Sequence, residues 1–394
     1  MKNTILKFSA IVLMTSAANA QTVRLVPEDH PTLQDAMKAA SPGDIIDLAP
    51  GTWTDQNIWG LSDDITLRGR PGGNQTVIDG AGYEWSPVVC FGNCRIENLI
   101  FRNGNGSNVF GNVRGGAIYA EFADVTISNC RFENNQVRMT DFDSNAIGGA
   151  VAGYFSALDI QGCDFTGNAS DLNGGAVYSY LGGMLRIADC TFTDNESDMY
   201  GGGVGLARTD FEITNCTFRR NYAGFLGAGI HSIGEAEGPN GPTGLIENCM
   251  FRRNSASYAG FGMGGGLATE NVQNVTIADS SFEDNYGYLS GAIAAGVGMP
   301  PDGFVEIRDN EFCGNALNTM YGNIVDAGGN NEEDSCFCSP DINDDGSVNS
   351  GDLGRVLADW NSFQPQSDIN NDGYVDGVDL AMVLVAWERN CGND

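Results

Sequence analysis

The chain has 394 residues and a formal net charge of −31 at pH 7, with 51 acidic against 20 basic residues and 54 glycines. Such an excess of negative charge argues against nucleic acid and anionic membranes as partners, because both would repel the chain. The length allows one large domain and one small one. A glycine-rich composition with few helical periods favours β structure.

The first twenty residues have the features of a secretory signal peptide. Lys2 and Lys7 accompany an apolar run around residues 11–13, and small residues follow at 18–20. Cleavage there would leave Gln21 as the first residue. No later stretch approaches the roughly 18 continuous apolar residues of a membrane span. We therefore expect a secreted, extracellular or cell-surface protein without a transmembrane segment.

A repeat of roughly 30 residues runs through most of the chain, a length typical of solenoids. Its core is a phenylalanine followed three residues later by asparagine and, in five repeats, preceded two residues earlier by cysteine. The phenylalanines are Phe101, Phe132, Phe165, Phe192, Phe218, Phe251, Phe282 and Phe312. The asparagines are Asn135, Asn168, Asn195, Asn221, Asn254, Asn285 and Asn315, and the cysteines are Cys130, Cys163, Cys190, Cys216 and Cys249. A second signature, GGA[IV] with variants, begins at residues 115, 148, 174, 201, 227, 264 and 290.

The alternation of side chains along a strand predicts a bend inside each repeat. Val125, Cys130 and Phe132 can share one face only if the chain bends near Asn129. Coils stacked about 4.8 Å apart then place like side chains in ladders. We expect the ladder asparagines at turn positions with left-handed backbone, and the glycine pairs at tight corners. The sequence therefore predicts a mainly β fold, a single-stranded right-handed parallel β-helix whose ladders are scaffold.

The two repeat signatures resemble those of the polymorphic outer-membrane adhesins and, more broadly, the pectin-lyase-like β-helix superfamily. The resemblance covers residues 23–335. The opening segment resembles the superfamily's usual start, which is a strand, a short helix and a first rung. Thr32 can cap a helix that closes the open end of the stack. The apolar face of this N-terminal cap helix would hold Leu33, Ala36, Met37 and Ala40.

The chain contains 11 cysteines. The five ladder cysteines are expected to be small buried core residues. Cys90 and Cys94 are close enough in sequence to form a local bridge. In an exported protein, three disulfides are plausible with connectivity left open, and we expect Cys391 to pair with Cys336 or Cys338. A metal site at Cys336 and Cys338 is disfavoured, because no histidine accompanies them. The six cysteines outside the ladder are Cys90, Cys94, Cys313, Cys336, Cys338 and Cys391.

Two acidic segments near the C-terminus have the spacing of calcium-binding loops. DINDDGSVNSGDL begins at residue 341 and DINNDGYVDGVDL at residue 368, with oxygen-bearing residues at positions one, three, five, nine and twelve and glycine at six. Position seven contributes its backbone carbonyl. The predicted ligands are Asp341, Asn343, Asp345, Ser347, Asn349 and Asp352, then Asp368, Asn370, Asp372, Tyr374, Asp376 and Asp379. We expect two calcium sites, and we expect the second, with four carboxylates against three, to fill first.

Each loop is followed by a predicted helix, but no helix is predicted before either loop. The helical stripes are Leu353, Val356, Leu357 and Trp360, then Leu380, Val383, Leu384 and Trp387. With Asp at position twelve, residues 336–394 resemble a type I dockerin more than a complete EF-hand. The resemblance implies attachment to a cohesin-like or other surface receptor, with a purely structural use as the rival. Dockerins usually dock through loop positions ten and eleven, which here are Ser350 and Gly351, then Gly377 and Val378, and not a matched polar pair. The expected domains are therefore a signal peptide at 1–20, a β-helix at 21–335 and a dockerin-like module at 336–394.

The β-helix leaves catalysis and binding as open alternatives. The superfamily includes pectate and alginate lyases and polygalacturonases, yet Lys38 in the cap helix is the one lysine after the signal peptide. A hydrolase would need paired carboxylates across a cleft, and of the polygalacturonase signatures only Asp63-Asp64 occurs. His30 and His231 are expected to be structural. We expect Arg131, Arg219, Arg220, Arg252 and Arg253 to be solvated.

Binding is favoured by insertions and aromatic residues. The insertions lie at 136–147, 233–244, 255–263 and 295–304. The aromatic residues that could stack on sugars are Tyr154, Phe155, Tyr178, Tyr180, Tyr222, Tyr258, Phe261, Tyr286 and Tyr288. Leu172, Met199, Phe225 and Tyr258 are expected to fill a corner of the core, and Asp194, Glu196 and Asp198 to form a solvated turn. We expect a carbohydrate-binding or adhesive protein, with a polysaccharide lyase or glycosidase carrying a dockerin as the alternative and catalytic residues unassigned.

Overall fold

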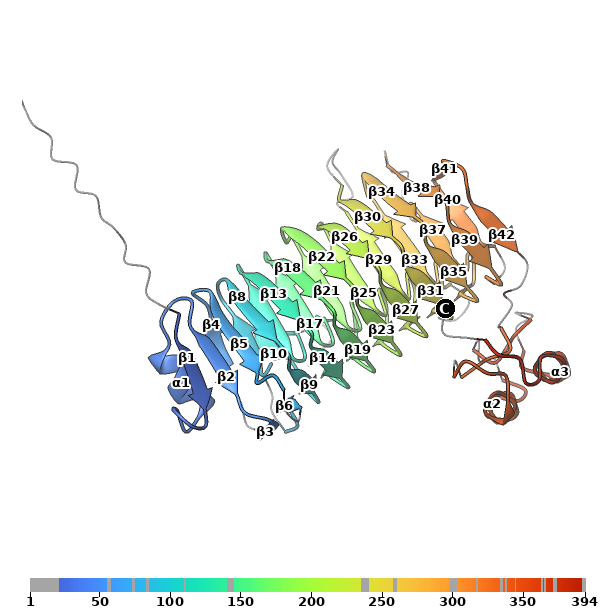
Figure 1. The fold of residues 1–394 in the computed structure, drawn as a ribbon. Coiled ribbons are helices and arrows are strands. Elements are labelled where there is room, and N and C mark those ends of the chain that lie inside the picture. The colour runs from blue at the N-terminus through green and yellow to red at the C-terminus, as the bar shows by residue number, and fades with distance from the viewer. Residues whose placement is uncertain are drawn as a thin grey trace, which may run out of the picture.

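The structure is a computed structural model. It describes residues 21–391 except 55–57, 73–74, 83–84, 110, 140–144, 235–240, 258–260, 298–302, 317, 334–335, 337–338, 344, 363, 365 and 371–373. The expected signal peptide therefore lies outside the described residues. Figure 1 shows an elongated stack of coils with α1 (Leu33–Ala39) at one end and α2 (Ser350–Ala358) and α3 (Gly377–Val385) at the other.

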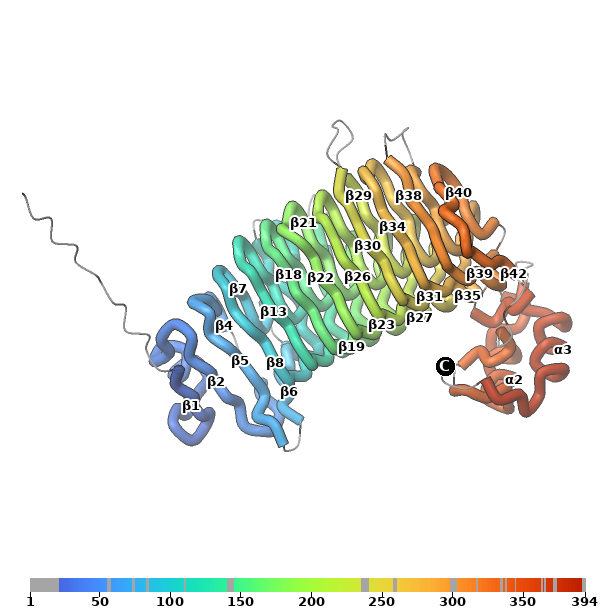
Figure 2. The backbone as a smooth tube through the Cα atoms, turned by 45° about the horizontal axis from the view of Figure 1, so that its top comes forward, coloured from blue at the N-terminus to red at the C-terminus, as the bar shows by residue number. Residues whose placement is uncertain are grey.

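Successive coils place their strands side by side in long parallel sheets (Figures 1 and 2). The 12-stranded sheet contains β1 (Val23–Val26), β2 (Ile45–Leu48), β5 (Ile65–Gly69), β8 (Cys94–Glu97), β13 (Asp124–Ser128), β18 (Ala157–Gln161), β22 (Met184–Ala188), β26 (Asp210–Thr214), β30 (Thr243–Glu247), β34 (Asn274–Ala278), β38 (Phe304–Arg308) and β41 (Ile324–Asp326). The 11-stranded sheet contains β3 (Gly51–Thr54), β6 (Thr76–Asp79), β9 (Ile100–Arg102), β14 (Arg131–Glu133), β19 (Asp164–Thr166), β23 (Thr191–Thr193), β27 (Thr217–Arg219), β31 (Met250–Arg252), β35 (Ser281–Glu283), β39 (Glu311–Cys313) and β42 (Asn331–Glu333).

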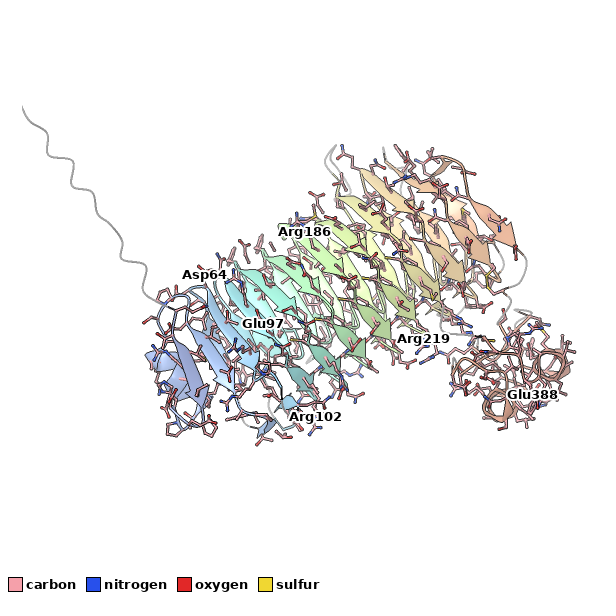
Figure 3. The ribbon with its side chains drawn as sticks, viewed as in Figure 1. Asp64, Glu97, Arg102, Arg186, Arg219 and Glu388 are labelled. Carbon is pink, nitrogen blue, oxygen red and sulfur yellow. A yellow bond between two sulfur atoms is a disulfide. The ribbon has the colours of Figure 1, made fainter. Side chains whose placement is uncertain are left out.

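The remaining sheets complete the wall of the coil. The 10-stranded sheet contains β4 (Ile58–Leu61), β7 (Val88–Cys90), β12 (Ile118–Glu121), β17 (Val151–Tyr154), β21 (Val177–Tyr180), β25 (Val204–Ala207), β29 (Ile230–Ile233), β33 (Leu267–Glu270), β37 (Ile293–Ala295) and β40 (Met320–Gly322). A six-stranded sheet contains β15 (Gln136–Val137), β20 (Ala169–Ser170), β24 (Glu196–Ser197), β28 (Tyr222–Ala223), β32 (Ser255–Ala256) and β36 (Tyr286–Gly287). A small sheet contains β10 (Ser107–Val109), its antiparallel neighbour β11 (Asn112–Arg114), and β16 (Ala146–Ile147). Charged side chains such as Arg102 and Arg186 lie on the outside of the stack (Figure 3).

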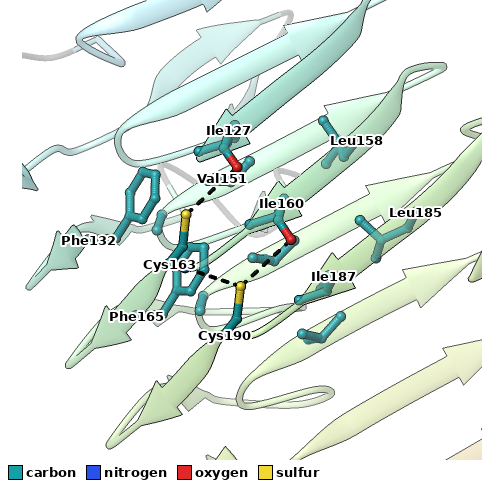
Figure 4. Close-up of a cluster of buried hydrophobic side chains, with 14 of the residues drawn as sticks. Ile127, Phe132, Val151, Leu158, Ile160, Cys163, Phe165, Leu185, Ile187 and Cys190 are labelled. Atoms are coloured by element: carbon teal, nitrogen blue, oxygen red, sulfur yellow. Dashed lines mark hydrogen bonds between the residues drawn. The ribbon is translucent and has the colours of Figure 1, made fainter. Parts of the chain in front are cut away.

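The phenylalanine ladder forms the centre of the core, as predicted. All eight rings are buried, and neighbouring ring centroids lie 4.6–5.3 Å apart with planes within 15° of parallel. Phe132 and Phe165 are adjacent rungs of this ladder (Figure 4). Because burying a phenylalanine contributes roughly 1.5–3 kcal/mol, the ladder is a major source of stability. The predicted mainly β parallel β-helix is thus confirmed.

The ladder asparagines face inward, and those from Asn135 to Asn285 donate both amide hydrogens. Asn195 donates from Nδ2 to the Phe165 carbonyl and to Asn221 Oδ1, both at 3.0 Å. The expectation of left-handed backbone at these positions was wrong. The left-handed residue precedes the ladder asparagine, as at Asp194 with φ 56°, because the chain must turn before the amide can point inward.

The ladder cysteines are buried thiols, as predicted, and each coil's cysteine Sγ accepts from a backbone N–H of the coil before it, as Cys190 does from Cys163. The expected bridge between Cys90 and Cys94 is wrong: both are thiols, with their sulfurs 3.1 Å apart inside the core. Cys313 bonds to Cys336 instead. Cys391 is also disulfide-bonded, and because Cys336 bonds to Cys313, only the second of its two expected partners stays open. The alternative partner, Cys338, lies outside the described residues.

The N-terminal cap and the glycine corners form as expected. Thr32 caps α1 by accepting from the Asp35 N–H at 3.1 Å, and α1 packs on the first strands. At the corners, the first glycine of the pair is left-handed, as at Gly148 with φ 68°. A Cβ at Gly149 would lie 1.9 Å from the Gly175 carbonyl oxygen, so only glycine permits this approach.

The C-terminal module has internal two-fold symmetry. The Val348 N–H donates to the Arg389 carbonyl after α3, at 2.9 Å, and the Val375 N–H donates to the Ser362 carbonyl after α2, at 3.0 Å. Val356 and Val383 belong to the small core between the helices. The outer halves of the predicted apolar stripes are exposed, contrary to expectation, because two helices offer only one shared face. These exposed residues are Leu357, Trp360, Leu384 and Trp387.

The module packs directly against the β-helix. Arg253, expected to be solvated, is buried here and donates to the backbone carbonyls of Ser339 and Asp341. Ser339 Oγ donates to Asp284 Oδ1 at 2.6 Å, and the Arg253 Nε lies 3.7 Å from Asp284 Oδ2. Among the described residues, none of the helices could cross a membrane.

Candidate functional site

The first acidic loop brings its predicted ligands together. Asn343 Nδ2 donates to Asp345 Oδ2 at 2.9 Å, and Asn349 Nδ2 donates to the same oxygen at 3.1 Å. Asn349 also donates to the Ser347 carbonyl at 2.9 Å. The two amides hold the pKa of Asp345 below its ordinary value, Asn349 contributing more than Asn343. Asp341 is buried and accepts from the Asp345 N–H at 3.2 Å. Positions one, three, five, seven and nine therefore surround one small volume.

The aspartate at position twelve, in the first turn of the helix that follows, accepts hydrogen bonds from the backbone of each loop. Asp352 is buried and accepts from the N–H groups of Asn343 and Asn349, at 3.1 and 2.7 Å. In the second loop, Asp379 accepts from the Ile369 and Asp376 N–H groups at 2.6 and 2.8 Å. The two loops are thus equivalent, with a capping box at the start of each helix.

The described part of the second loop is arranged like the first. Asp368 is buried, Asp376 caps α3 by accepting from the Val378 N–H at 2.7 Å, and Tyr374 is exposed. The backbone of Asn370 donates to Asp379 at 3.2 Å. Asp372 lies outside the described residues.

The donor chemistry of both loops fits calcium. Every predicted ligand offers oxygen, which calcium prefers, and four of the carboxylates are buried. Burying carboxylates is unfavourable unless a cation or hydrogen bonds compensate for the lost water. Across the described residues, no three His, Cys, Asp or Glu side chains are grouped to hold a metal ion, since amides separate the carboxylates of the first loop. The four buried carboxylates are Asp341, Asp352, Asp368 and Asp379.

A cluster of exposed aromatic rings covers the N-terminal coils of the β-helix; we call it the aromatic platform. Trp59 contacts Trp85 and Phe91 edge to face, with centroids 5.7 and 5.3 Å apart. Phe122 stacks on Phe155 at 5.1 Å with planes 5° apart. These five side chains are 39–69% exposed. Of the five, only Phe155 is among the aromatic residues predicted from the sequence to stack on sugars.

Phe122 and Phe155 occupy a strained backbone position. Both have φ of 52° at the turn between the 10-stranded and 12-stranded sheets. Bulky side chains seldom adopt the left-handed region, which glycine and asparagine enter more easily. Exposed phenylalanines at such a position gain little from burial, so the strain points to a use for the exposed parts of these rings.

Polar groups lie directly behind the platform. Tyr154 stacks on Tyr180 at 4.7 Å, and the buried Arg114 guanidinium lies 4.0 Å from the Tyr154 ring. Arg114 donates to the Tyr119 hydroxyl at 2.9 Å. Burial raises the pKa of Tyr119 to about 12, so its hydroxyl stays protonated. Tyr178, also predicted to meet sugar, is buried.

Two surface cavities lie on later coils of the β-helix. One, of about 360 Å³, is lined by Leu181, Gly182, Arg208, Asp210, Gly241, Pro242, Thr243 and Gln273. The other, of about 490 Å³, is lined by Asn215, Cys216, Thr217, Asn248, Cys249, Met250, Asp279, Ser280, Ser281, Asp309 and Glu311. The first continues the line of turns that carries Phe122 and Phe155.

The other predicted aromatic residues do not join the platform. Tyr222 donates to the Ser257 carbonyl at 2.7 Å, while Phe261 and Tyr288 are exposed near the other end of the stack. Tyr286 is half-buried, and burial raises its pKa. Leu172 and Phe225 pack on the outer face of the 10-stranded sheet, so their expected place inside the coil is wrong. Tyr258 and parts of all four insertions lie outside the described residues.

Two polar clusters bear on catalysis. Arg138, Asp171 and Asp198 follow successive strands of the six-stranded sheet, and Arg138 pairs with Asp171 at 2.6 Å. Burial, and then the Asp171 charge, raise the pKa of Asp198. His231 is buried, with Nε2 2.8 Å from Glu270 Oε1 and its ring stacked on Tyr200. The expected structural role of His231 therefore agrees with its burial.

Comparison with protein families identifies the two parts of the chain. Residues 79–240 and 149–337 match the model described as right handed beta helix region, and together they span more than half of the chain. The chain belongs to the right-handed β-helix family. Residues 339–386 match the dockerin type I domain, a domain that binds calcium. None of the curated proteins matches the chain.

The chain is similar to several solved structures at low identity. An alginate lyase from Paenibacillus sp. str. FPU-7 is 16% identical with a TM-score of 0.44, covering 74% of this chain and 95% of that one. Pectate lyase Pel9A is 15% identical with a TM-score of 0.41, covering 92% and 84%. The family 28 exopolygalacturonase of Yersinia enterocolitica is 10% identical with a TM-score of 0.39, covering 79% and 77%. Likeness at this level carries no conclusion about activity.

Proposed function

We propose that this protein is secreted or held at the cell surface, that its β-helix binds carbohydrate, and that its dockerin domain attaches it to a protein receptor. The aromatic platform is the observation that carries the carbohydrate proposal. Its rings lie on four successive coils in two contacting groups, Trp59 with Trp85 and Phe91, and Phe122 with Phe155, and all five remain exposed. Exposed apolar patches mark interaction sites, and aromatic faces stack on the apolar faces of sugar rings.

A glycan array with the purified full-length chain tests this binding. We expect retention on polysaccharides or oligosaccharides, and the hits should then be incubated with the protein. Binding without new reducing ends or unsaturated uronate absorbance supports a binding module. No retention on any glycan would contradict the proposal.

We also propose that the dockerin domain holds two calcium ions, one in each loop. A titration against a chromophoric chelator should give two sites, with the second loop filling first because it has four carboxylates against three. Asp345→Ala should abolish the weaker site, and Asp376→Ala should weaken the tighter one. Equal affinities or the reverse order would contradict the assignment.

Attachment should depend on those ions. The receptor proposed is a cohesin-like module, and pull-down with immobilised cohesin modules should retain the chain in calcium and release it in EGTA. Loop positions ten and eleven are exposed in both loops, which keeps them accessible to a partner. Retention that ignores EGTA would contradict a calcium-dependent dockerin.

A second candidate function is polysaccharide cleavage by the β-helix. The column of Arg138, Asp171 and Asp198 favours it, because the raised pKa of Asp198 suits a general acid and Arg138 pairs with Asp171 beside it. Asp198→Asn should then abolish product formation on any glycan that the array identifies. Unchanged product formation in this variant would exclude the column as the catalytic site.

A further inference from the structure

The aromatic platform and the cavity of about 360 Å³ belong to one continuous track. Phe122, Phe155, Leu181 and Arg208 occupy the same turn in four successive coils, all with φ between 46° and 54°. Backbone hydrogen bonds keep them in register: the Phe122 N–H donates to the Tyr154 carbonyl, and the Phe155 N–H to the Tyr180 carbonyl. Leu181 and Arg208 line the cavity, so the ring stack leads directly into it.

Negative charge surrounds this track. The described turns between the 10-stranded and 12-stranded sheets, with the residue on either side, carry six carboxylates and one arginine, Arg208. Asp64 lies at the outer edge of the stack beside the turn of Phe91 (Figure 3), where its N–H donates to the Asn93 carbonyl at 2.8 Å. The carboxylates are Asp63, Asp64, Glu121, Asp124, Asp210 and Glu270.

The nearby arginines do not reverse this balance. Arg114 is buried under Tyr154 and donates to the Tyr119 hydroxyl, so its charge is held behind the rings. Arg95 is exposed on β8 but lies on the outer face of the 12-stranded sheet, beside Thr66 and Thr126. The whole chain, which includes these carboxylates, has a net charge of −31. A polymer with one carboxylate per sugar would meet repulsion within a Debye length of about 8 Å along the whole track.

We propose that this track binds a neutral polysaccharide lying along the axis of the β-helix, and that it rejects polyuronates. The proposal rests on the carbohydrate-binding function proposed above and names the class of ligand. At the platform, Phe122 and Phe155 stack on each other, so successive sugars contact the exposed edges of these two rings and the exposed rings of Trp59 and Trp85. Asp210, Thr243 and Gln273 offer hydrogen-bonding groups to sugar hydroxyls in the cavity.

The spacing of the coils supports an axial orientation. Neighbouring coils lie about 4.8 Å apart, which is close to the length of one pyranose ring. A polymer along the axis therefore meets an equivalent turn at nearly every sugar. A polymer across the axis would meet only one ring of the stack.

Affinity electrophoresis of the full-length protein tests the proposal. Gels should contain glucomannan, mixed-linkage β-glucan or xylan as neutral probes, and polygalacturonate or alginate as anionic probes, each with calcium and with EGTA. We expect retardation by at least one neutral polymer and none by either polyuronate. Phe122→Gly and Trp59→Ala should each weaken the association constant at least tenfold, and Phe122→Tyr should retain it.

The matched control is Phe261→Ala, which removes an equally exposed phenylalanine away from the track and should leave retardation unchanged. Retardation by a polyuronate that Phe122→Gly abolishes would overturn the neutral-ligand proposal while the carbohydrate-binding function stands. Neutral binding that survives Phe122→Gly and Trp59→Ala would overturn the track. Retardation by no polymer would instead contradict the proposed function. Circular dichroism of each variant confirms the fold.

Discussion

Single asparagines stabilise this core because their hydrogen bonds are complete. The Asn195 amide donates to the coil before it and to the coil after it, and its Oδ1 accepts from Asn168 at 3.0 Å. A buried polar group is costly only when a partner is missing. The column of amides therefore contributes specificity of register without an energetic penalty.

Replacing Asn195 by Asp should break this column. The carboxylate has no N–H to donate to the Phe165 carbonyl and would face Asn221 Oδ1 as a second acceptor. We expect a loss of about 3–5 kcal/mol in the free energy of unfolding, as for other unpaired buried charges. Denaturant unfolding measures this, with the exposed Gln161→Ala as the control that should change little. A loss equal to that of the control would show that the column is not supporting the coil.

Phe122 should show the opposite behaviour, because its backbone is strained and its ring is exposed. A glycine releases strain of about 1–3 kcal/mol at a left-handed position but adds roughly 1 kcal/mol of unfolded-state entropy. We therefore expect Phe122→Gly to leave the unfolding temperature unchanged or raised. The buried Phe132→Ala should lose about 3–5 kcal/mol by comparison. A marked destabilisation by Phe122→Gly would mean that the ring supports the fold and is not kept for binding.

At the scale of strands and turns, repetition decides what the sequence reveals. Cys163, Phe165 and Asn168 sit in the same surroundings as their counterparts one coil away, so the ladders were readable from spacing alone. The left-handed turn was misplaced by one residue, because asparagine also occurs at the left-handed position, as Asn134 does. Repetition cannot reveal which side chain is left exposed.

The platform was missed for a related physical reason. Trp59 and Phe91 lie in the first coils, which lack the glycine and asparagine signatures, and the pairing of β4 with β7 shifts register after Trp59. That register shift decides which side chains of these two coils come into contact, and the repeat pattern does not predict it. Arg253 was likewise assigned to solvent, since no pattern along the chain reveals that a second domain covers it.

The N-terminal cap is an element whose stability should depend on pH. Arg70 donates to both Glu28 carboxylate oxygens, which lowers the pKa of Glu28 to about 2. The Ser41 N–H and other donors, Thr22 and Arg24, also lower the pKa of Asp44. A depressed folded-state pKa contributes stability above the unfolded value, and that contribution disappears as pH falls through the folded value.

We therefore expect the cap to weaken as pH falls from about 4.5 towards 2. Tryptophan fluorescence in a Trp360→Phe, Trp387→Phe background reports on the N-terminal end, because the other tryptophans lie there. Arg70→Gln removes the Glu28 contribution at every pH, so its unfolding midpoint should change less across this window. An identical pH profile in both proteins would contradict the role of Arg70.

On the scale of the whole molecule, the calcium module and the β-helix form a joined structure. Asp341, the predicted first ligand position, has its carbonyl held by Arg253 from the side of the β-helix, and Cys313–Cys336 fixes the chain just before it. A change in the first loop should therefore affect the last coils of the β-helix, and a change in those coils should affect the loop. Whatever stabilises the first loop should also stabilise the last coils, because coupling between two sites is reciprocal.

Calcium should accordingly protect the C-terminal coils, and Arg253 should transmit that protection. In hydrogen exchange, we expect EGTA to speed exchange at β31 and β35 as well as in the module, while β18 and β22 stay unchanged. Arg253→Gln removes the guanidinium that holds the Asp341 carbonyl and pairs with Asp284. The first loop should therefore bind calcium several-fold more weakly. The neighbouring Arg252→Gln, whose partner Glu283 lies on the β-helix itself, is the matched control and should keep wild-type affinity. If Arg253→Gln binds calcium as tightly as the control, and EGTA leaves the coils protected, the dockerin domain folds and binds its ions independently of the β-helix.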